Sequence, residues 1–101
     1  MTMTKSRPIT GDHVDLILDA SWFTVTGSIT VGGVTAEGVD CAKLILPDTD
    51  PQHRRALKAT TSVQYWLYRD SILMYHSPLL QVTRVHRTDS GNLTVTAARH
   101  R

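Results

Sequence analysis

The sequence predicts an all-β fold, or a β-rich α+β fold, in which about six or seven short strands form a small antiparallel barrel or sandwich. Short segments alternate apolar and polar residues, glycine-containing turns separate these segments, and only one stretch begins like a helix. A chain of 101 residues is long enough for one hydrophobic core and too short for two domains. We therefore expect a flexible N-terminal arm over residues 1–11 and a single β-rich domain over residues 12–101.

The first two strands are predicted from the alternation of their side chains. In residues 13–19 a valine and two leucines share one side of the strand, and Ile17 is the apolar exception on the polar side. Residues 22–31 continue the alternation, with a row of serine and threonine hydroxyls opposite the apolar row. Gly27 interrupts the apolar row, so we expect a bulge or a bend at this position.

A tight hairpin is predicted at Gly32-Gly33. Both central residues of a type I′ turn need a positive φ, which glycine adopts without steric cost. A two-residue turn here sets Val31 opposite Val34, and the next apolar pair on the same face is Ile29 with Ala36. The two apolar patterns agree, which supports this register.

The only helix is predicted over residues 51–59, after a strand over residues 39–46. Asp50 can cap the free amides, and Pro51 fits the first helical position because it has no N–H to leave unpaired. We expect about two or three turns, which bridge two sheets or plug one end of a barrel. The exposed side of this helix should carry the basic residues Arg54, Arg55 and Lys58.

The second half of the chain predicts the remaining strands. They cover residues 63–68, 72–75 and 79–87, and a last strand follows the turn at residues 88–91. In that turn Gly91 can take the left-handed position of a three-residue loop with a bulge, which matches apolar residues with each other across the hairpin. The bulged register pairs Arg87 with Leu93, Val85 with Val95 and Thr83 with Ala97.

The charges are distributed unevenly along the chain. The net charge is +2, but the first 50 residues contain three basic and seven acidic side chains, whereas the remaining 51 contain eight and two. This asymmetry indicates either an acidic or nucleic-acid partner for the basic half, or complementary faces that pair within the fold or between copies.

The hydropathy of the chain predicts a cytoplasmic protein. No stretch approaches the roughly 20 consecutive apolar residues of a membrane-spanning helix, so we expect no membrane association. The first residues are positively charged without an apolar segment, so we expect no secretory signal. Cys41 is the only cysteine, which excludes an intrachain disulfide and a cysteine-based zinc site.

The residues that could do chemistry form no known catalytic or cofactor motif, so we expect no enzyme, no cofactor and no small-molecule substrate. The five histidines lack metal-ligand spacing. Asp48 and Asp50 are interpreted as capping carboxylates rather than, with Asp40, as ligands of a divalent cation. Cys41 is interpreted as a small buried hydrophobic residue rather than a nucleophile.

The most informative segment is residues 64–69, which combines two aromatic residues with an arginine. If the odd-numbered residues of this strand face the core, Trp66 and Tyr68 project from the opposite face with Arg69 nearby. Three interpretations stay open. These side chains can anchor a protein interface, stack the bases of a single-stranded nucleic acid, or belong to a strand that is buried on both sides.

Basic residues near the C-terminus add to the nucleic-acid interpretation. In the bulged register Arg84 and His86 share a face with Thr94 and Thr96, which suits phosphate groups. Such threonine rows are also typical of strand faces in water. The further candidates for an interface or a nucleic-acid contact are Arg87, Arg99, His100 and Arg101.

These observations lead us to expect a small non-enzymatic protein-interaction or assembly domain. It would self-associate as a homo-oligomer, or bind a larger protein, through the face of Trp66 and Tyr68. An accessory, inhibitory or structural role of the kind that phages and mobile elements encode fits by analogy of size. The alternative is a single-stranded nucleic-acid-binding β-barrel that uses Trp66 and Tyr68 for stacking and the C-terminal arginines for phosphates.

Overall fold

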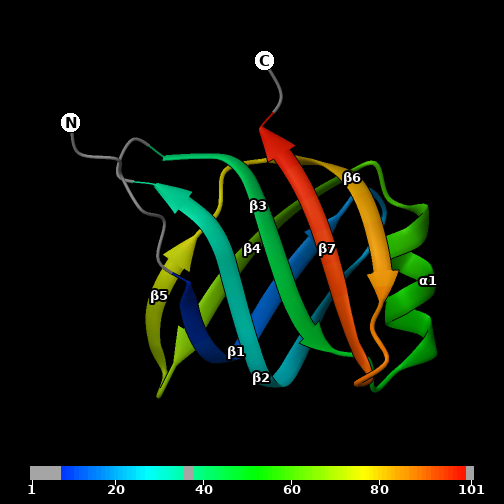
Figure 1. Ribbon diagram of the computed structural model, residues 1–101, viewed down its shortest axis with the longest axis horizontal. Coiled ribbons are helices and arrows are strands. Elements are labelled where there is room, and N and C mark those ends of the chain that lie inside the picture. The colour runs from blue at the N-terminus through cyan, green and yellow to red at the C-terminus, as the bar shows by residue number, and fades with distance from the viewer. Residues whose placement is uncertain (1–7, 36–37, 100–101) are drawn as a thin grey trace.

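The computed structural model describes residues 8–35 and 38–99, which form strands and one helix (Figure 1). The elements are β1 (Ile9–Leu18), β2 (Trp22–Thr35), β3 (Gly38–Pro47), α1 (Pro51–Ala59), β4 (Ser62–Arg69), β5 (Ile72–His76), β6 (Leu80–Arg87) and β7 (Asn92–Arg99). Because β1 begins at Ile9, residues 9–11 of the expected arm belong to a strand. Residues 1–7 of that arm lie outside the described residues.

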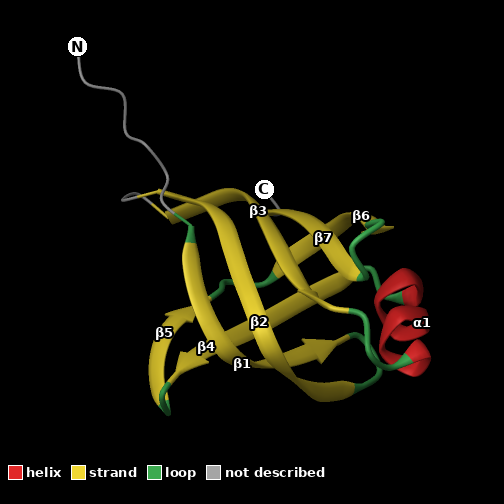
Figure 2. Ribbon diagram, turned by 60° about the horizontal axis from the view of Figure 1, so that its bottom comes forward, coloured by secondary structure: helices red, strands yellow, loops and turns green. Residues whose placement is uncertain are grey.

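The strands form one antiparallel sheet in the order β1-β2-β3-β7-β6-β4-β5. β1 pairs with β2 along one edge and with β4 along the other, so six strands close into a barrel, and β5 extends from β4 (Figures 1 and 2). The predicted small antiparallel barrel is confirmed. The alternative of a sandwich is wrong, because β1 is paired with a strand on both of its edges.

The core fills the inside of the barrel with alternate residues from each strand. Residues two apart share one face of a strand, and the buried residues follow this spacing, so the predicted alternation is confirmed. The buried residues of β1, β4 and β7 show this best, and they are Val14, Leu16, Leu18, Val63, Tyr65, Leu67, Leu93, Val95 and Ala97. All the residues between them on these three strands are partly or fully exposed.

Gly27 lies at an irregularity in the pairing of β1 with β2, as the sequence predicts. The register shifts opposite the segment between Gly11 and His13, and the extra residue lies on β2. Gly27 has a φ of 129°, which residues with a side chain rarely adopt. A Cβ atom at Gly27 would also lie 2.8 Å from Cγ of Pro47. The glycine therefore permits both the bulge and the close approach of β3.

The predicted turn at Gly32-Gly33 is wrong, because both glycines lie within β2. Val31 is paired with Leu44 of β3 instead of Val34. Gly33 has a φ of 82° and lies where the register of β2 and β3 shifts. One residue of β2, Gly33, lies here opposite three residues of β3, so its positive φ belongs to an irregularity inside the hairpin rather than to the turn. Ala36, which belongs to the predicted register, lies outside the described residues.

The hairpin of β6 and β7 has the predicted loop, with Gly91 at a φ of 84°. The structure confirms the pairing of Arg87 with Leu93 and of Val85 with Val95. The third predicted pair is wrong, because the register shifts once more at Thr83, so that Val82 is paired with Ala97. A bulge in the middle of a strand has no turn residue to mark it, so the alternation alone could not locate it.

α1 covers one end of the barrel (Figure 2), which is the plugging arrangement that the sequence allowed. The side chain of Asp50 accepts a hydrogen bond from the backbone N–H of Gln52 at 2.9 Å, and Pro51 occupies the first turn, as predicted. Leu57 is fully buried and joins the core of the barrel. Burial of Leu57, the packing of Ala56 on the core and the stacking of His53 on Phe23 hold a short helix that would be marginal on its own.

Asp48 joins the start of α1 to the hairpin of β6 and β7. Its carboxylate lies 2.7 Å from the guanidinium of Arg54 and 2.8 Å from that of Arg87, and its side chain is 2% exposed. Its backbone N–H donates to the carbonyl of Gly91 at 3.0 Å. An acid from the first half of the chain thus pairs within the fold with bases from the second half, as one interpretation of the charge asymmetry predicts.

Asp19 connects the end of β1 to the segment between α1 and β4. Its carboxylate accepts hydrogen bonds from the side-chain hydroxyls and the backbone N–H groups of Ser62 and Thr61. These hydrogen bonds hold the pKa of Asp19 well below its usual value.

We predict that the substitution Asp19→Asn makes stability less sensitive to acid. A carboxyl group whose pKa is lowered by folding stabilises the fold above its unfolded pKa of about 3.9 and loses this contribution as the pH falls below it. Thermal melts followed by circular dichroism should therefore show a wild-type advantage at neutral pH that narrows below about pH 4. If the wild-type protein were more stable than Asp19→Asn by the same amount at neutral pH and below about pH 4, the lowered pKa of Asp19 would be contradicted.

Candidate functional site

Trp66 and Tyr68 project from the outside of the barrel. The residues that alternate with them on β4 are fully buried in the core, whereas Trp66 and Tyr68 are only partly buried. A closed barrel has one interior, and no second layer among the described residues covers the outside of β4. The interpretation of Trp66 and Tyr68 as core residues is therefore wrong.

Neighbouring strands place further side chains beside Trp66 and Tyr68. β1 lies between β2 and β4, and β5 follows on the other side of β4. Residues that are directly opposite in an antiparallel pair share one face of the sheet. We call this outer surface the aromatic face, and its cross-strand rows are Trp22-Ile17-Gln64, Thr24-Asp15-Trp66-His76 and Thr26-His13-Tyr68-Leu73.

Large apolar side chains on the aromatic face are exposed to water. The exposed fraction is 75% for Trp22, 49% for Leu73 and 47% for Ile17. Ile17 and Trp22 are direct cross-strand partners, so their side chains form one contiguous patch at the end of β1 and β2. Grouped apolar exposure of this kind is typical of an interaction surface, whereas single exposed apolar residues are ordinary.

Ring contacts fix the aromatic residues of this face in position. Trp66 stacks on His76 with ring centroids 4.6 Å apart and planes 12° apart. The ring of His13 meets that of Tyr68 edge-on, with centroids 5.2 Å apart. The side-chain amide of Gln64 lies 3.1 Å from Nε2 of His76 and adds a hydrogen bond to the stacked pair. Trp66 and Tyr68 therefore present surfaces with restricted rotamers.

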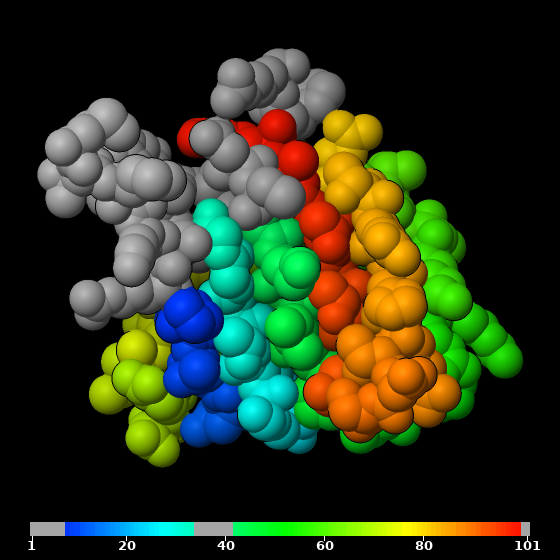
Figure 3. All heavy atoms as spheres, viewed as in Figure 1, coloured from blue at the N-terminus to red at the C-terminus, as the bar shows by residue number. Residues whose placement is uncertain are grey.

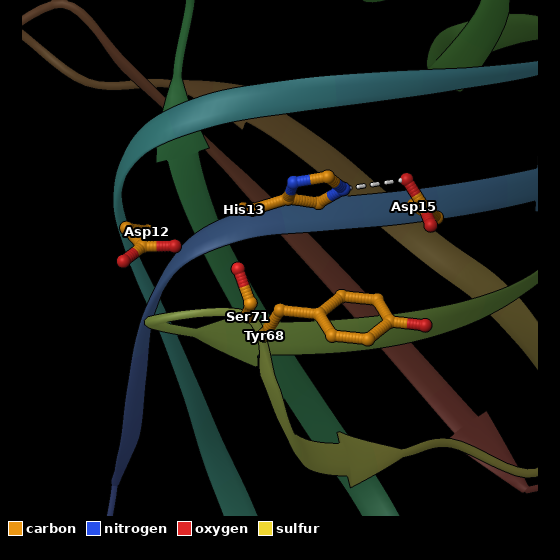
Figure 4. Close-up of a pocket in the computed structure, with 5 residues that line it drawn as sticks. All are labelled: Asp12, His13, Asp15, Tyr68 and Ser71. Atoms are coloured by element: carbon orange, nitrogen blue, oxygen red, sulfur yellow. Dashed lines mark hydrogen bonds and ion pairs between the residues drawn. The ribbon is translucent and has the colours of Figure 1, made fainter.

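A cleft of about 270 Å³ opens beside Tyr68, lined by Asp12, His13, Asp15 and Ser71 (Figure 4). Nε2 of His13 lies 2.9 Å from Oδ1 of Asp15, and the hydroxyl of Thr24 donates to the same oxygen at 2.7 Å. Burial raises the pKa of Asp15, but the hydrogen bonds from Thr24 and His13 lower it more, so the carboxyl group is ionised at neutral pH.

This cleft contains a histidine and a carboxylate, but no nucleophile is hydrogen-bonded to the histidine. Figure 4 shows Ser71 on the turn after β4, and the described residues include no hydrogen bond between Ser71 and His13. Nucleophilic catalysis needs such a pair, in which the base takes the proton of the attacking hydroxyl. The arrangement holds Asp15 and His13 in fixed orientations on the surface, which suits recognition by hydrogen bonds.

The predicted basic face also exists, but it lies elsewhere on the barrel. Arg84 and His86 are paired with Thr96 and Thr94 as predicted, and Lys43 of β3 is the next outward residue beside Thr96. β6 lies beside α1, on the side of the barrel away from β5 (Figures 1 and 2), and Arg84 lines a groove together with Leu57 and Lys58 of α1. The structure therefore does not bring the aromatic residues and these basic residues together.

The remaining predicted site residues are dispersed. Arg69 lies at the end of β4 near the aromatic face and donates to the hydroxyl of Thr10 at 3.3 Å. Arg87 is bound by Asp48, as described above. Arg99 is paired with Leu80 and lies near Tyr75, whose pKa is raised by burial in spite of this arginine. His100 and Arg101 lie outside the described residues.

The contribution of β1 and β2 to the aromatic face was not predicted from the sequence. Ile17 was visible as an apolar residue on a polar side, and Trp22 lies on the same side of β2 as the threonines. Two large apolar residues on the water-facing sides of consecutive strands are therefore the signal that could have indicated this surface. Which other strand lies beside them depends on barrel closure, and alternation within a strand carries no information about closure.

The metal interpretations have no support among the described residues, which contain no cluster of three or more histidine, cysteine, aspartate or glutamate side chains suited to a metal ion. The side chains of Cys41 and Asp40 lie outside the described residues. Among the residues that the structure describes, the only helix is nine residues long, far short of a membrane span.

The chain matches no family model, no curated protein and no solved structure.

We predict that Trp66→Ala folds and loses less stability than Leu67→Ala, its neighbour on the inside of β4. Removing the fully buried leucine should cost about 2–5 kcal/mol, because it leaves a cavity in the core. Removing the half-buried tryptophan leaves no closed cavity, so its loss should be smaller. Chemical denaturation of both variants measures the two losses, and a larger loss for Trp66→Ala would show that Trp66 belongs to the core after all.

Proposed function

We propose that the protein is a small non-enzymatic assembly domain that self-associates through the aromatic face. The observation that supports this most is Trp22, which is 75% exposed and lies directly beside the exposed Ile17. Full burial of a large apolar side chain contributes about 1.5–3 kcal/mol, so covering this pair provides a driving force for association. The cytoplasmic setting and the accessory, inhibitory or structural role of phage or mobile-element type belong to the same proposal.

The chemistry of the aromatic face favours a second copy of the chain as its partner. The cleft beside Tyr68 carries the carboxylates of Asp12 and Asp15 with His13 between them in sequence, and Arg69 follows Tyr68 and donates to Thr10. An isologous dimer presents the same face twice, so acids of one copy can meet bases of the other around an apolar centre. A face with both signs of charge and exposed apolar residues is thus suited to bind the same face of a second copy.

The residue types and their rigidity favour strong contacts at this face. Tryptophan, tyrosine and arginine are the residues most often responsible for the binding energy of protein interfaces. The stacking of Trp66 on His76 and the contact of Tyr68 with His13 restrict these side chains before any partner binds. Association then costs less side-chain entropy than it would with freely rotating side chains.

The proposal predicts that Trp22→Ala weakens self-association by at least about 2 kcal/mol, which is roughly a thirtyfold higher dissociation constant. Ile17→Ala should weaken it as well, whereas the matched control Ile45→Ala should not, because Ile45 is an outward residue of β3 on another side of the barrel. Sedimentation equilibrium over a range of protein concentrations measures all three variants. Salt should weaken association only modestly, because it screens the charge pairs around the face but not the contact at its apolar centre.

Two results would contradict self-association through this face. The first is a wild-type protein that stays monomeric at high micromolar concentration and low salt. The second is an equal loss of association in Ile17→Ala and Ile45→Ala, which would place the interface elsewhere on the barrel. Circular dichroism of each variant establishes that the fold is intact.

Single-stranded nucleic-acid binding is the second candidate, and the basic face favours it. Lys43, Arg84 and His86 lie on adjoining outward positions with the hydroxyls of Thr94 and Thr96 between them, which suits contacts to phosphates. The aromatic face lies on other strands, so stacking and phosphate contacts would fall on separate surfaces. Titration of a labelled oligothymidine at two salt concentrations separates the candidates. Saturable binding that Arg84→Ala weakens, with a salt slope smaller by about one counterion, would favour this function over self-association.

A further inference from the structure

A groove separates α1 from β6 at the end of the barrel away from β5. Its volume is about 370 Å³, and its walls are the end of α1 with the residue that follows it and the middle of β6. In the space-filling view of Figure 3, β6 (orange) lies along one side of the molecule, with the segment that contains α1 (green) beside it. Its lining includes Leu57 and Lys58 of α1 and Thr83, Arg84 and Val85 of β6.

The edge of β6 that faces this groove lacks a strand partner. β6 is paired with β7 along its length, but its pairing with β4 is limited to Leu80 and Gln81. The backbone N–H of Val82 still donates to the carbonyl of Thr61 at 2.9 Å. Beyond Val82 the described residues include no strand on this side of β6, because the chain before β4 turns away into α1. A strand edge without a partner is a template for another extended chain.

The hairpin geometry identifies which backbone groups point to this edge. The N–H of Thr88 donates to the carbonyl of Asn92 at 2.8 Å, so these two residues form a hydrogen-bonded pair. Hydrogen-bonded and non-hydrogen-bonded pairs alternate along an antiparallel ladder. The backbone N–H and C=O groups of His86 and Arg84 therefore also point toward β7. The N–H and C=O groups of Val85 and Arg87 therefore point away from β7, toward the side of the groove.

The groove is cationic. Among the residues that the structure describes, its charged lining residues are Lys58 and Arg84, and none of its lining residues is an acid. Neither side chain forms an ion pair with any residue that the structure describes, whereas Arg54 and Arg87 are both bound by Asp48. The two cations of the groove are therefore available for an anionic partner.

We propose that this groove binds an acidic, extended segment of a partner protein, which pairs with the edge of β6 and places its carboxylates against Lys58 and Arg84. Strand addition satisfies the backbone groups of Val85 and Arg87, and alternate side chains of the segment supply the charges. A peptide fits better than a nucleic acid, because the groove has no aromatic side chain for stacking and the strand edge requires backbone amides. The site is independent of the aromatic face, which lies on other strands.

The test uses the full chain and a fluorescent peptide of about eight residues in which glutamate alternates with threonine. We expect saturable binding by fluorescence anisotropy at micromolar to submicromolar protein concentrations. Lys58→Gln and Arg84→Gln should each weaken it at least about fivefold, whereas the matched control Lys43→Gln should not, because Lys43 lies on β3, beyond β7, and does not line the groove. Trp22→Ala should leave it unchanged, so failure of the self-association proposal is distinguishable from failure of this one.

A second peptide tests the strand pairing itself without altering the protein. Methylation of alternate backbone nitrogens keeps every charge but removes the N–H groups that a new strand must donate, so this analogue should bind at least about tenfold more weakly. The amides of Val85 and Arg87 should gain protection from hydrogen exchange when the unmodified peptide binds. Equal binding of the two peptides, an equal effect of Lys43→Gln, preferential binding of an oligothymidine, or no binding at all would each overturn the proposal.

Discussion

The antiparallel pairing of β1 with β4 closes the sheet, and the candidate surfaces follow from it. β1 is paired on both edges, so Val14, Leu16 and Leu18 must face the interior and the residues between them must face water. The same pairing brings His13 and Asp15 beside Tyr68 and Trp66, which lie about fifty positions later in the chain. Without closure, the cleft and the ring contacts of the aromatic face would have no second strand to form them.

The way the barrel closes also leaves parts of two strand edges unpaired among the described residues. β4 is shared between β6 near its start and β5 near its end, so each of these two strands has a stretch of edge without a partner among the described residues. At one such place α1 lies across the end of the barrel, held by Leu57 in the core and by Asp48 between two arginines. The result is a domain whose exposed apolar pair Ile17 and Trp22 and whose aromatic residues Trp66 and Tyr68 lie on the outside of β1, β2 and β4. A cationic groove lies elsewhere, between α1 and β6.

Local features of this fold could be predicted from the sequence, and long-range ones could not. Alternation located the buried residues of β1 and β4, and Asp50 with Pro51 marked the start of α1 because capping is a local interaction. The glycine pair at residues 32–33 was misread because a positive φ serves a bulge as well as a turn. The candidate site was found in part: Trp66 and Tyr68 were identified, but their neighbours Ile17 and Trp22 depend on which strands pair.

We propose that closure builds one self-complementary surface from β1, β2, β4 and β5. Two-dimensional amide spectra of the wild-type protein, recorded over a dilution series, test it residue by residue. The account predicts that concentration-dependent shifts concentrate at Ile17, Trp22 and Trp66 and are absent at Lys43 and Thr96 on the other side of the barrel. Spectra that do not change on dilution, or shifts that concentrate on β3 and β7, would contradict it.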